Sequence, residues 1–574
     1  MLNQQAAQMR HKKIKYSVIS LCLLFSITGT GSVSGQERLM DVIEGELRIY
    51  FKELGKEKVP PYFMSCRVDD VTTTSVDASF GVVNGVTKNR IVAALPEVRV
   101  GSPEFDNFHN NTPGTTISFF APPEPILLPY ESTGSESAIK QILWNEFLSR
   151  YKYGVASYQA MRSAKGVRAE ESDKSPDFTQ VEVVNYHEEP LNMDKALMDV
   201  EKSKSIAKKY SALFLQYPDI IRGSVSVRQE IIRKYYISTE GARIAHNLTH
   251  NFLMVRAAVK ADDGMDLPLA ITYFSFDRDG FPDEEVIKKD ILNLADRLIK
   301  LKNAPVVQPY TGPALLSGST SGVFFHEIFG HRIEGQKMKS DGDGQTFKKM
   351  IGKQVLPLTM SVYDDPSLEV YKGMDLNGHY KFDDQGVKGE RVTVVKEGIL
   401  NDFLMTRTAI DGFPRSNGHS RAEVGYDPTS RQSNLIIETS DYKSEEELRQ
   451  MLKDEAASQG KDYGFFFKEV TGGFTMTGRN SPNAFNVTPL EVYKVYVDGR
   501  EDELVRGVDL IGTPLSMFSN IICAGGVTES FVGSCGSISG YVPVSAISPA
   551  ILVNKVELQM KPRSRNLPPV LARP

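Results

Sequence analysis

Cysteine is scarce in this sequence, and its scarcity excludes one class of protein at the outset. The 574 residues contain four cysteines, Cys22, Cys66, Cys523 and Cys535. Small exported domains that depend on disulfides carry cysteines far more densely and at recurrent spacings. The chain must therefore fold around ordinary hydrophobic cores, for which its 41% hydrophobic content is sufficient. Its length predicts two to four domains.

Long apolar runs are also missing, apart from one near the N-terminus. The run at 16–27 follows a basic stretch without acidic residues and precedes small residues at 29–35. That order is typical of a signal peptide, and the run is short for a membrane span. We expect cleavage after Gly35, export to the periplasm or the extracellular space, and no membrane span in the mature chain. An uncleaved anchor is the alternative; lipidation of Cys22 is less favoured, because apolar rather than small polar residues follow it.

A basic run is absent from the rest of the chain. The formal net charge is −5, and loss of residues 1–35 would remove four positive charges and no negative ones, leaving −9. An acidic chain of this kind disfavours binding to nucleic acid or to an anionic membrane surface. The mature chain would keep three cysteines, and an odd number leaves at least one thiol without a disulfide partner.

The hydrophobic patterns divide the chain near residue 305. Upstream, helical patterns cover 38–54, 137–164, 193–216 and 283–301. Strand-like patterns cover 64–99, 224–239, 242–258 and 269–276, with Asn84–Gly85 as a hairpin turn. Downstream, glycine and β-forming residues dominate around one clear helix at 444–459. We therefore predict an α+β fold with a signal peptide at 1–35, an N-terminal domain at 36–305 and a β-rich domain at 306–574. The first domain holds an antiparallel sheet and a helical insertion at about 137–216.

One short segment of the second domain carries the residue types of a metallopeptidase. Residues 317–335 read SGSTSGVFFHEIFGHRIEG. His326 and His331 offer imidazole ligands, and Glu327 offers a carboxylate that can take a proton from water. The histidines are five residues apart rather than four, which on a regular helix separates them by about 140° instead of about 40°. Gly330 can end the helix or accommodate a π-bulge. The alternative reading is a pair of structural histidines beside a buried helix.

This segment resembles the HExxxH segment of the TldD/PmbA family of metallopeptidases. Further stretches are similar to that family in the same order: VKGERVTVVKEGILNDFLMTRTAIDGFPRSNGHSR at 387–421, DYGFFFKEVTGGFTMTGRNSPNAF at 462–485 and ESFVGSCGSISG at 529–540. The resemblance covers about residues 305–558 and is weaker upstream. It implies that the β-rich domain carries the HExxxH motif on a helix.

The resemblance also implies a site, a mechanism and an assembly. His326, His331 and the distant Cys535 would bind Zn²⁺, and Glu327 would act as general base. Relatives of the PmbA type lack the motif, so its presence groups this chain with the catalytic members of the family. The family implies a homodimer or a heterodimer with a PmbA-like relative, and an enclosed active-site cavity. Its familiar members are cytoplasmic, so the predicted export departs from the family pattern.

By sequence alone, the third ligand has to be chosen among the three cysteines of the mature chain. Cys535 lies among glycines and serines that suit a close approach to a metal. Cys523 follows an apolar run and is expected to be a small buried hydrophobe, and Cys66 lies outside the similar region. Glu334 is the alternative third ligand, or else it orients a histidine from behind.

Other residues are weaker candidates. His246 and His250 are four apart on an expected strand, which makes a second site conceivable. His419 and Arg421 lie in the similar region and are candidates for stabilising an oxyanion. Four aspartates are expected in turns or on solvated faces, with calcium binding as an alternative: Asp364, Asp365, Asp383 and Asp384. A G-x-S-x-G anchor for serine catalysis is absent.

The sequence thus predicts a secreted zinc metallopeptidase that hydrolyses unstructured peptides with water activated by Glu327. Two alternatives stay open. One is a non-catalytic binding or assembly protein of the same fold with a structural zinc ion. The other is a metal-dependent amidase that acts on a non-peptide substrate. An intact Glu327 disfavours the first, because a structural metal site needs no base.

Overall fold

The computed structural model describes residues 35–109, 126–129, 135–165, 173–339, 345–477 and 485–561. The expected signal peptide lies outside the described residues except for Gly35, as does Cys22. Most of the proline-rich segment 113–129 lies outside them as well. Within the described part, no helix has both the length and the apolar character that crossing a bilayer requires.

An eight-stranded sheet forms the upstream half of the molecule. Its long strands are β1 (Pro61–Ser79), β2 (Val82–Ser102), β6 (Ile220–Ser238), β7 (Arg243–Lys260) and β8 (Asp266–Ser275), and its short strands are β3 (Phe105–Asp106), β4 (Ile126–Leu127) and β5 (Asn185–His187). The order is β3-β2-β1-β6-β7-β5, and β8 pairs with β7. All the long strands pair antiparallel, and β5 alone runs parallel to β7. The predicted antiparallel sheet is confirmed.

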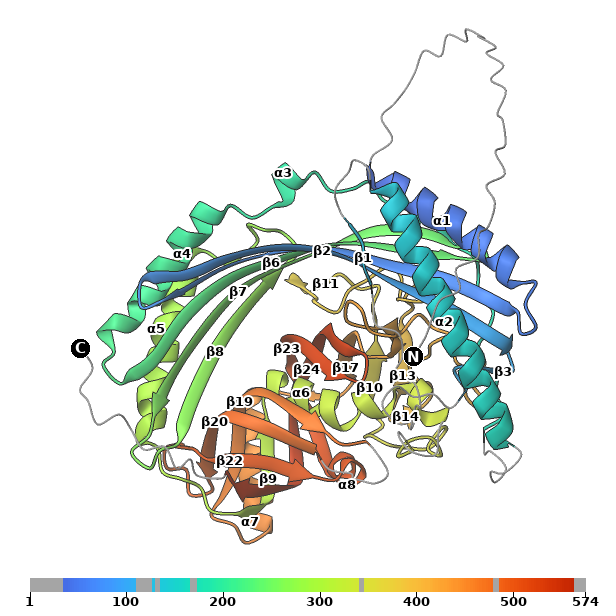
Figure 1. The fold of residues 1–574 in the computed structure, drawn as a ribbon. Helices are drawn as coiled ribbons and strands as arrows, with labels where there is room; N and C mark the ends of the chain where they lie inside the picture. The colour runs from blue at the N-terminus through green and yellow to red at the C-terminus, as the bar shows by residue number, and fades with distance from the viewer. Residues whose placement is uncertain are drawn as a thin grey trace, which may run out of the picture.

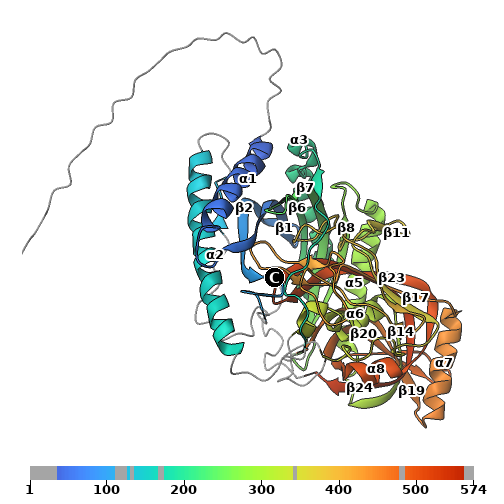
Figure 2. The ribbon, with the colours of Figure 1, turned by 90° about the vertical axis from the view of Figure 1, so that its right-hand side faces the viewer.

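Helices cover one face of this sheet. They are α1 (Gly35–Leu54), α2 (Glu136–Lys165), α3 (Met193–Ala196), α4 (Val200–Ala212) and α5 (Glu284–Asn303), with a 3₁₀ turn at Leu213–Gln216. Along β1, Met64 and Val68 pack in the cluster with α1 and α2, whereas Val76 and Ala78 pack in the cluster with α4 and α5. These positions share one face because side chains alternate along a strand. Figures 1 and 2 show the sheet as an arch with the helices outside it.

The C-terminal half lies under that arch and is built on a twelve-stranded sheet. Its strands are β9 (Tyr310–Leu316), β10 (Met360–Asp364), β13 (Val392–Lys396), β14 (Ile399–Leu400), β17 (Asn434–Thr439), β18 (Tyr442–Lys443), β19 (Tyr463–Thr475), β20 (Phe485–Tyr496), β21 (Glu503–Val505), β22 (Val508–Gly512), β23 (Ile521–Ser537) and β24 (Gly540–Met560). Two small ribbons pair β11 (Val370–Tyr371) with β12 (Met374–Asp375) and β15 (Ser420–Arg421) with β16 (Thr429–Ser430). The helices are α6 (Gly318–Ile328), α7 (Glu445–Ser458) and α8 (Pro514–Ser519). The α+β fold with a β-rich C-terminal part and a motif helix is confirmed.

Two local predictions are wrong. The hairpin between β1 and β2 turns at Phe80 and Gly81, which have φ values of 47° and 85°. Asn84–Gly85 lies inside β2 instead, where Gly85 pairs with Asp77. Two successive residues with positive φ match the twist of the flanking strands. Phe80 therefore adopts an unfavourable positive φ, and the long pairing register of β1 with β2 is kept.

The segment 193–216 also differs from the single helix that was expected. Asp199 interrupts it: its side chain accepts hydrogen bonds from the backbone N–H groups of Glu201 and Lys202 and starts α4 afresh. A residue that caps a helix in this way leaves the helical conformation itself. The boundary that we predict near residue 305 lies between the end of α5 and the start of β9.

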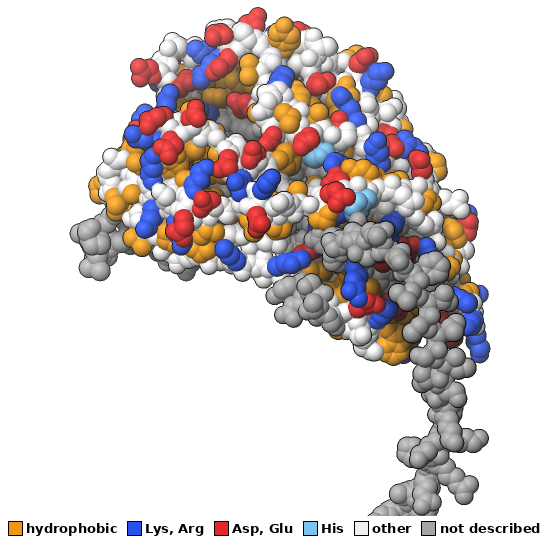
Figure 3. Space-filling model, turned by 90° about the horizontal axis from the view of Figure 1, so that it is seen from above, with side chains coloured by type: hydrophobic (Ala, Val, Ile, Leu, Met, Phe, Trp, Pro, Cys, Tyr) orange, Lys and Arg blue, Asp and Glu red, His pale blue; other side chains and the backbone are white. Residues whose placement is uncertain are grey.

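The outer surface of the arch carries charged side chains of both signs. Figure 3 views the molecule from above the arch and shows acidic and basic side chains interspersed over that face. Charges of both signs at close spacing give a weak net field at a distance. On the face in view, the charges do not form a continuous basic surface.

Candidate metal centre

Helix α6 carries the histidine–glutamate pair into the core of the C-terminal half. Ser317 caps its N-terminus, since its hydroxyl accepts a hydrogen bond of 3.2 Å from the backbone N–H of Thr320. Apart from Ser319, every residue of α6 is buried, and its apolar side chains Val323, Phe324, Phe325 and Ile328 belong to the main core cluster. The helix is thus fixed on its apolar sides.

The helix ends between the two histidines, and this ending explains their unusual spacing. α6 stops at Ile328, and Gly330–Arg332 form a separate 3₁₀ turn. The turn brings the rings of His326 and His331 to a centroid distance of 5.1 Å. A side chain at position 330 would have to displace the amide of Gln432, because a Cβ there would lie 1.7 Å from Oε1 of Gln432. Of the two possibilities raised by the sequence, the structure has the helix end rather than a π-bulge.

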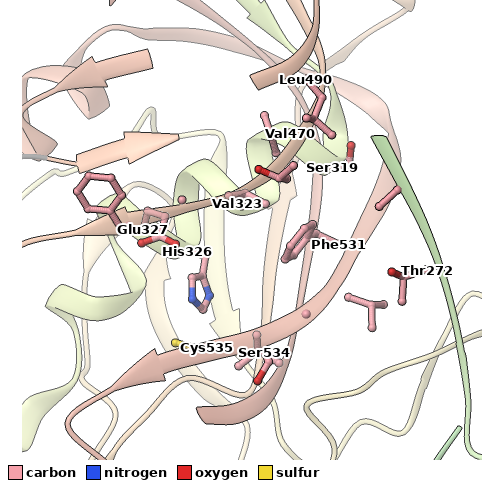
Figure 4. A pocket seen from close by; sticks show the side chains of 18 of the residues that line it. Thr272, Ser319, Val323, His326, Glu327, Val470, Leu490, Phe531, Ser534 and Cys535 are labelled. Carbon is pink, nitrogen blue, oxygen red and sulfur yellow. The ribbon is translucent and has the colours of Figure 1, made fainter. Parts of the chain in front are cut away.

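Cys535 on β23 completes a group of three ligand atoms. Its Sγ lies 3.4 Å from Nε2 of His331. The ligand atoms of His326, His331 and Cys535 all lie within 4.8 Å of one another, and all three residues are buried. Figure 4 shows the His326 ring and the Cys535 sulfur converging from α6 and β23. Two imidazoles and one thiolate match the three protein ligands of a catalytic zinc site with one open position.

The electrostatics of the cluster fit a cation. Burial opposes ionisation of the Cys535 thiol, but the adjacent His331 and His326 outweigh burial and hold its pKa well below its ordinary value. Burial likewise opposes the charged form of His331, but Cys535 and Glu334 raise its pKa to about 10. Without an ion, the cluster therefore favours a thiolate beside protonated imidazole. A divalent cation would displace those protons and bind the same three donors.

Glu327 lies beside these ligands without belonging to them. It is buried and lines the same cavity as His326, His331 and Cys535. Burial raises the pKa of its carboxyl, although the neighbouring histidines oppose the shift. Strand β19 can pass close to Glu327 only because residue 473 is glycine, since a Cβ there would lie 2.7 Å from Cγ of Glu327. A carboxyl of raised pKa next to a metal site is suited to proton transfer.

The site opens into a large cavity between the two halves of the molecule. The cavity has a volume of about 1630 Å³; strands β6, β7 and β8 of the arch form one wall, and α6, β19 and β23 form the other. Apolar side chains on this second wall include Val323, Val470, Leu490 and Phe531 (Figure 4). Typical small-molecule sites enclose about 300–1,000 Å³. This cavity can therefore hold several residues of an extended chain.

Known proteins resemble this chain in sequence and in fold. Residues 309–560 match the family model of the PmbA/TldA metallopeptidase C-terminal domain, which is close to the 305–558 expected from the sequence. The C-terminal half of this chain therefore carries a domain of the PmbA/TldA metallopeptidase family.

Relatives of this chain are named as metalloproteases. A metalloprotease of Methanocaldococcus jannaschii is 27% identical over 371 residues, which cover 64% of this chain and 72% of that protein. A protein named zinc metalloprotease TldD homolog from Saccharolobus solfataricus is 26% identical over 365 residues, with coverage of 62% and 76%. The chain spans about half the length of further curated metalloproteases that it matches.

Solved structures share the fold. TldE from Thermococcus kodakarensis superposes with a TM-score of 0.58, covering 90% of this chain and 100% of that one, at 11% sequence identity. At that identity the likeness concerns the fold alone. It extends over both halves of the molecule and so includes the arch, where the family model does not reach.

Behind the ligands lies a buried network of charges from distant parts of the chain. Oε2 of Glu334 lies 3.4 Å from Nδ1 of His331 and also pairs with Lys337. Arg431 lies 3.5 Å from Oε1 of Glu334 and donates hydrogen bonds to the carbonyl of Cys535 and, at 2.7 Å, to Ser539. Glu334 is thus placed behind His331 rather than among the ligand atoms. Nothing in the sequence alone singled out Lys337 or Arg431.

The HNLTH pair does not form a second site. His246 and His250 are buried in β7, and burial lowers the pKa of His246 to about 3 and that of His250 to about 4. Aromatic rings surround them: Phe382 lies near His246, and Phe274 near His250. Among the residues described, the one group of three clustered metal-binding side chains is His326, His331 and Cys535.

Of the two positions expected for the four aspartates, turns and solvated faces, the solvated faces are wrong, whereas Asp384 lies in a turn. Asp364, Asp365, Asp383 and Asp384 are all buried. Asp383 accepts hydrogen bonds from the backbone N–H groups of Gln385, Val387 and Ser420. Asp384 pairs with Lys234 and Arg67 of the arch. The first carboxylate fixes a loop and the second joins the two halves, and such partners from other parts of the chain cannot be read from local sequence.

The two oxyanion candidates point elsewhere. Nε2 of His419 lies 3.1 Å from Asp364, and Arg421 donates to the carbonyl of Gln432. Neither residue lines the cavity. The remaining cysteines stay apart from the site as well: Cys66 is buried in the core under α1 and α2, and Cys523 packs beside Met451.

Proposed function

We propose that this chain is a zinc metallopeptidase with His326, His331 and Cys535 as ligands and Glu327 as general base. The observation that carries the proposal is the convergence of three donor atoms within 4.8 Å of one another, beside a buried carboxyl, on the wall of one large cavity. The names of the related metalloproteases support the same class of reaction.

The residues of the site have distinct tasks in peptide hydrolysis. A zinc ion held by the three ligands supplies a Lewis acid that polarises the scissile carbonyl and makes water more acidic. Glu327 takes a proton from the attacking water and then gives it to the leaving amine. Its raised pKa, caused first by burial, allows the carboxyl to hold that proton between the two steps. Glu334 keeps His331 oriented through the Nδ1 contact.

The shape of the cavity favours an extended peptide as substrate. Strand β19 pairs with β9 only through residues 465–467, and its residues Lys468–Thr475 then line the cavity. The corresponding edge of β19 is thus free of a neighbouring strand in the described part of the chain. A peptide can pair with such an edge through backbone hydrogen bonds. A stably folded protein cannot enter a space of this size, so unfolded chains and short peptides are the proposed substrates.

A structural zinc site fits this geometry less well. Glu327 lies next to the ligands and shares the cavity with them, and a site that only stabilises the fold needs neither a base nor access to solvent. A metal-dependent amidase that acts on another class of amide would use the same residues, and the assay with peptides separates the two.

We also propose export and dimerisation. The support for export is the basic, apolar and small order of residues 1–35. Mass spectrometry of the mature protein should find its N-terminus between about residues 30 and 38. The support for a dimer, with itself or with a PmbA-like relative, is the match of the C-terminal half to this family. Size measurement across micromolar concentrations tests it.

Replacement of the base tests the proposed mechanism. Glu327→Gln keeps the volume of the side chain but cannot take the proton, so peptide hydrolysis should fall by about 10²–10⁴-fold while the zinc content stays near that of the parent. Glu469→Gln is the matched control, because Glu469 also lines the cavity but pairs with Arg297. Hydrolysis by Glu327→Gln at the rate of the parent would rule out the mechanism.

A further inference from the structure

The arch contributes a wall of defined composition to the cavity, opposite the metal ligands. On β6 and β7, Ser224 pairs directly with Arg256, and Arg222 pairs with Ala258. On β8, Ala270 pairs with Arg256 from the other side. Residues directly opposite each other in antiparallel strands project from the same face. All five line the cavity, so two arginines stand on its wall among small side chains.

Unlike most charged side chains of the cavity, Arg256 lacks an ion-pair partner among the residues described. Lys468 pairs with Glu491, Lys337 with Glu334 and Glu469 with Arg297, and Glu529 accepts a hydrogen bond from the backbone N–H of Ser319. Arg222 lies 3.7 Å from Asp266, with both side chains well exposed. The contact of Arg256 is Nη2 to Sδ of Met254 at 3.4 Å, and among the residues described no carboxylate lies within ion-pair distance of it.

The surroundings of Arg256 leave its guanidinium accessible. Arg256 is exposed, and its neighbours across the strands, Ser224 and Ala270, are too small to cover it. A guanidinium presents its N–H donors in a planar fork that matches the two oxygens of a carboxylate. Because the chain carries a net charge of −5, attraction of an anion to this wall is a local property rather than a general one.

We propose that Arg256, assisted by Arg222, forms a subsite for a carboxylate of the peptide substrate. The carboxylate is either the C-terminus of the peptide or an aspartate or glutamate side chain. The subsite lies across the cavity from Glu327, so it holds the substrate at a distance from the scissile bond and selects among peptides. The proposal rests on the proposed function for its substrate, but its binding step does not depend on turnover.

Three peptides of one parent sequence separate the two sources of carboxylate. The first peptide has glutamine at one chosen position and a C-terminal amide. The second has glutamate at that position and the amide, and the third has glutamine there and a free C-terminal carboxylate. Fluorescence anisotropy measures their binding to the Glu327→Gln chain, which retains the site but does not cleave. Either the second or the third peptide should bind about tenfold more tightly than the neutral one, as expected for a charge-assisted pair. The peptide that gains identifies the source.

Substitutions assign the effect to Arg256. In the same background, Arg256→Gln should bring the preference to within about twofold, and Arg256→Lys should restore part of it, because lysine keeps the charge but not the fork. Arg228→Gln is the matched control: Arg228 lies on β6, the strand next to that of Arg256, but pairs with Glu230 and does not line the cavity. It should leave the preference intact.

Two outcomes would overturn the subsite: equal binding of all three peptides, or a preference that survives in Arg256→Gln. An equal loss in Arg228→Gln would also overturn it, since the cause would then be the general field of the arch. Peptide hydrolysis by the parent chain is measured in a separate assay. Selective binding without any hydrolysis would contradict the proposed peptidase and support the subsite.

Discussion

The two walls of the cavity are built in different ways. On the C-terminal wall, the ligands and Glu327 are buried and are held by further buried charges, Glu334 and Arg431 among them. On the wall of the arch, most side chains are small or exposed, and none supplies a ligand atom to the cluster. Buried charges must be paired and fixed, whereas exposed ones can meet a variable partner. If the proposed catalysis and the proposed subsite are both right, chemistry and substrate selection lie on separate walls, and substitutions should change them separately.

The largest expected effect concerns the C-terminal wall. Cys535→Ala removes one of three ligands, so zinc and hydrolysis should be lost together. Cys523→Ala is the control, because Cys523 is only partly buried beside Met451 and should cost no more than a modest loss of stability. Metal analysis and a peptide assay on both variants check this. Zinc bound by Cys535→Ala as tightly as by the parent would return Glu334 to consideration as the third ligand.

A smaller effect is expected behind the ligands. Glu334→Gln keeps the shape of the side chain but removes the charge that faces His331 and Lys337. Loss of such a partner costs about 10–100-fold in metal affinity or activity. Competition with a chelator should therefore strip zinc from this variant at a lower chelator concentration than from the parent. If the two resisted the chelator equally, Glu334 would have no part in holding His331.

The smallest effect should come from the arch. Thr272 on β8 lines the cavity and is exposed, so Thr272→Trp narrows the space for substrate and should raise KM several-fold with unchanged zinc content. Thr87→Trp places the same side chain on an exposed part of β2, away from the cavity, and should act like the parent. Loss of zinc in Thr272→Trp would break the separation between the two walls.

Much of the fold was predictable because its signals are local. The helices α1, α2, α5 and α7 and the strands β6, β7 and β8 lie within a few residues of the ranges expected from periodicity. The hairpin was misplaced because Asn–Gly is a strong turn signal, yet the register of β1 with both neighbours fixes the turn at Phe80–Gly81. The pairing of distant strands overrides a local preference.

The site was predictable in part for a similar reason. His326, Glu327 and His331 stand in one short segment, and resemblance to the family pointed to Cys535. The residues that position them did not stand out, because Lys337 and Arg431 acquire their meaning only from contacts made in the fold. Arg256 could not be found from sequence at all, since its role depends on how the arch faces the metal ligands.

The most direct test of the account is X-ray absorption at the zinc edge of the purified chain. We expect one zinc ion per chain with two nitrogen ligands at about 2.0–2.1 Å, one sulfur ligand at about 2.3 Å and a further light atom. In Cys535→Ala the sulfur signal should vanish. A zinc site without sulfur in the parent chain, or one bound by two or more sulfur atoms, would contradict the assignment of His326, His331 and Cys535.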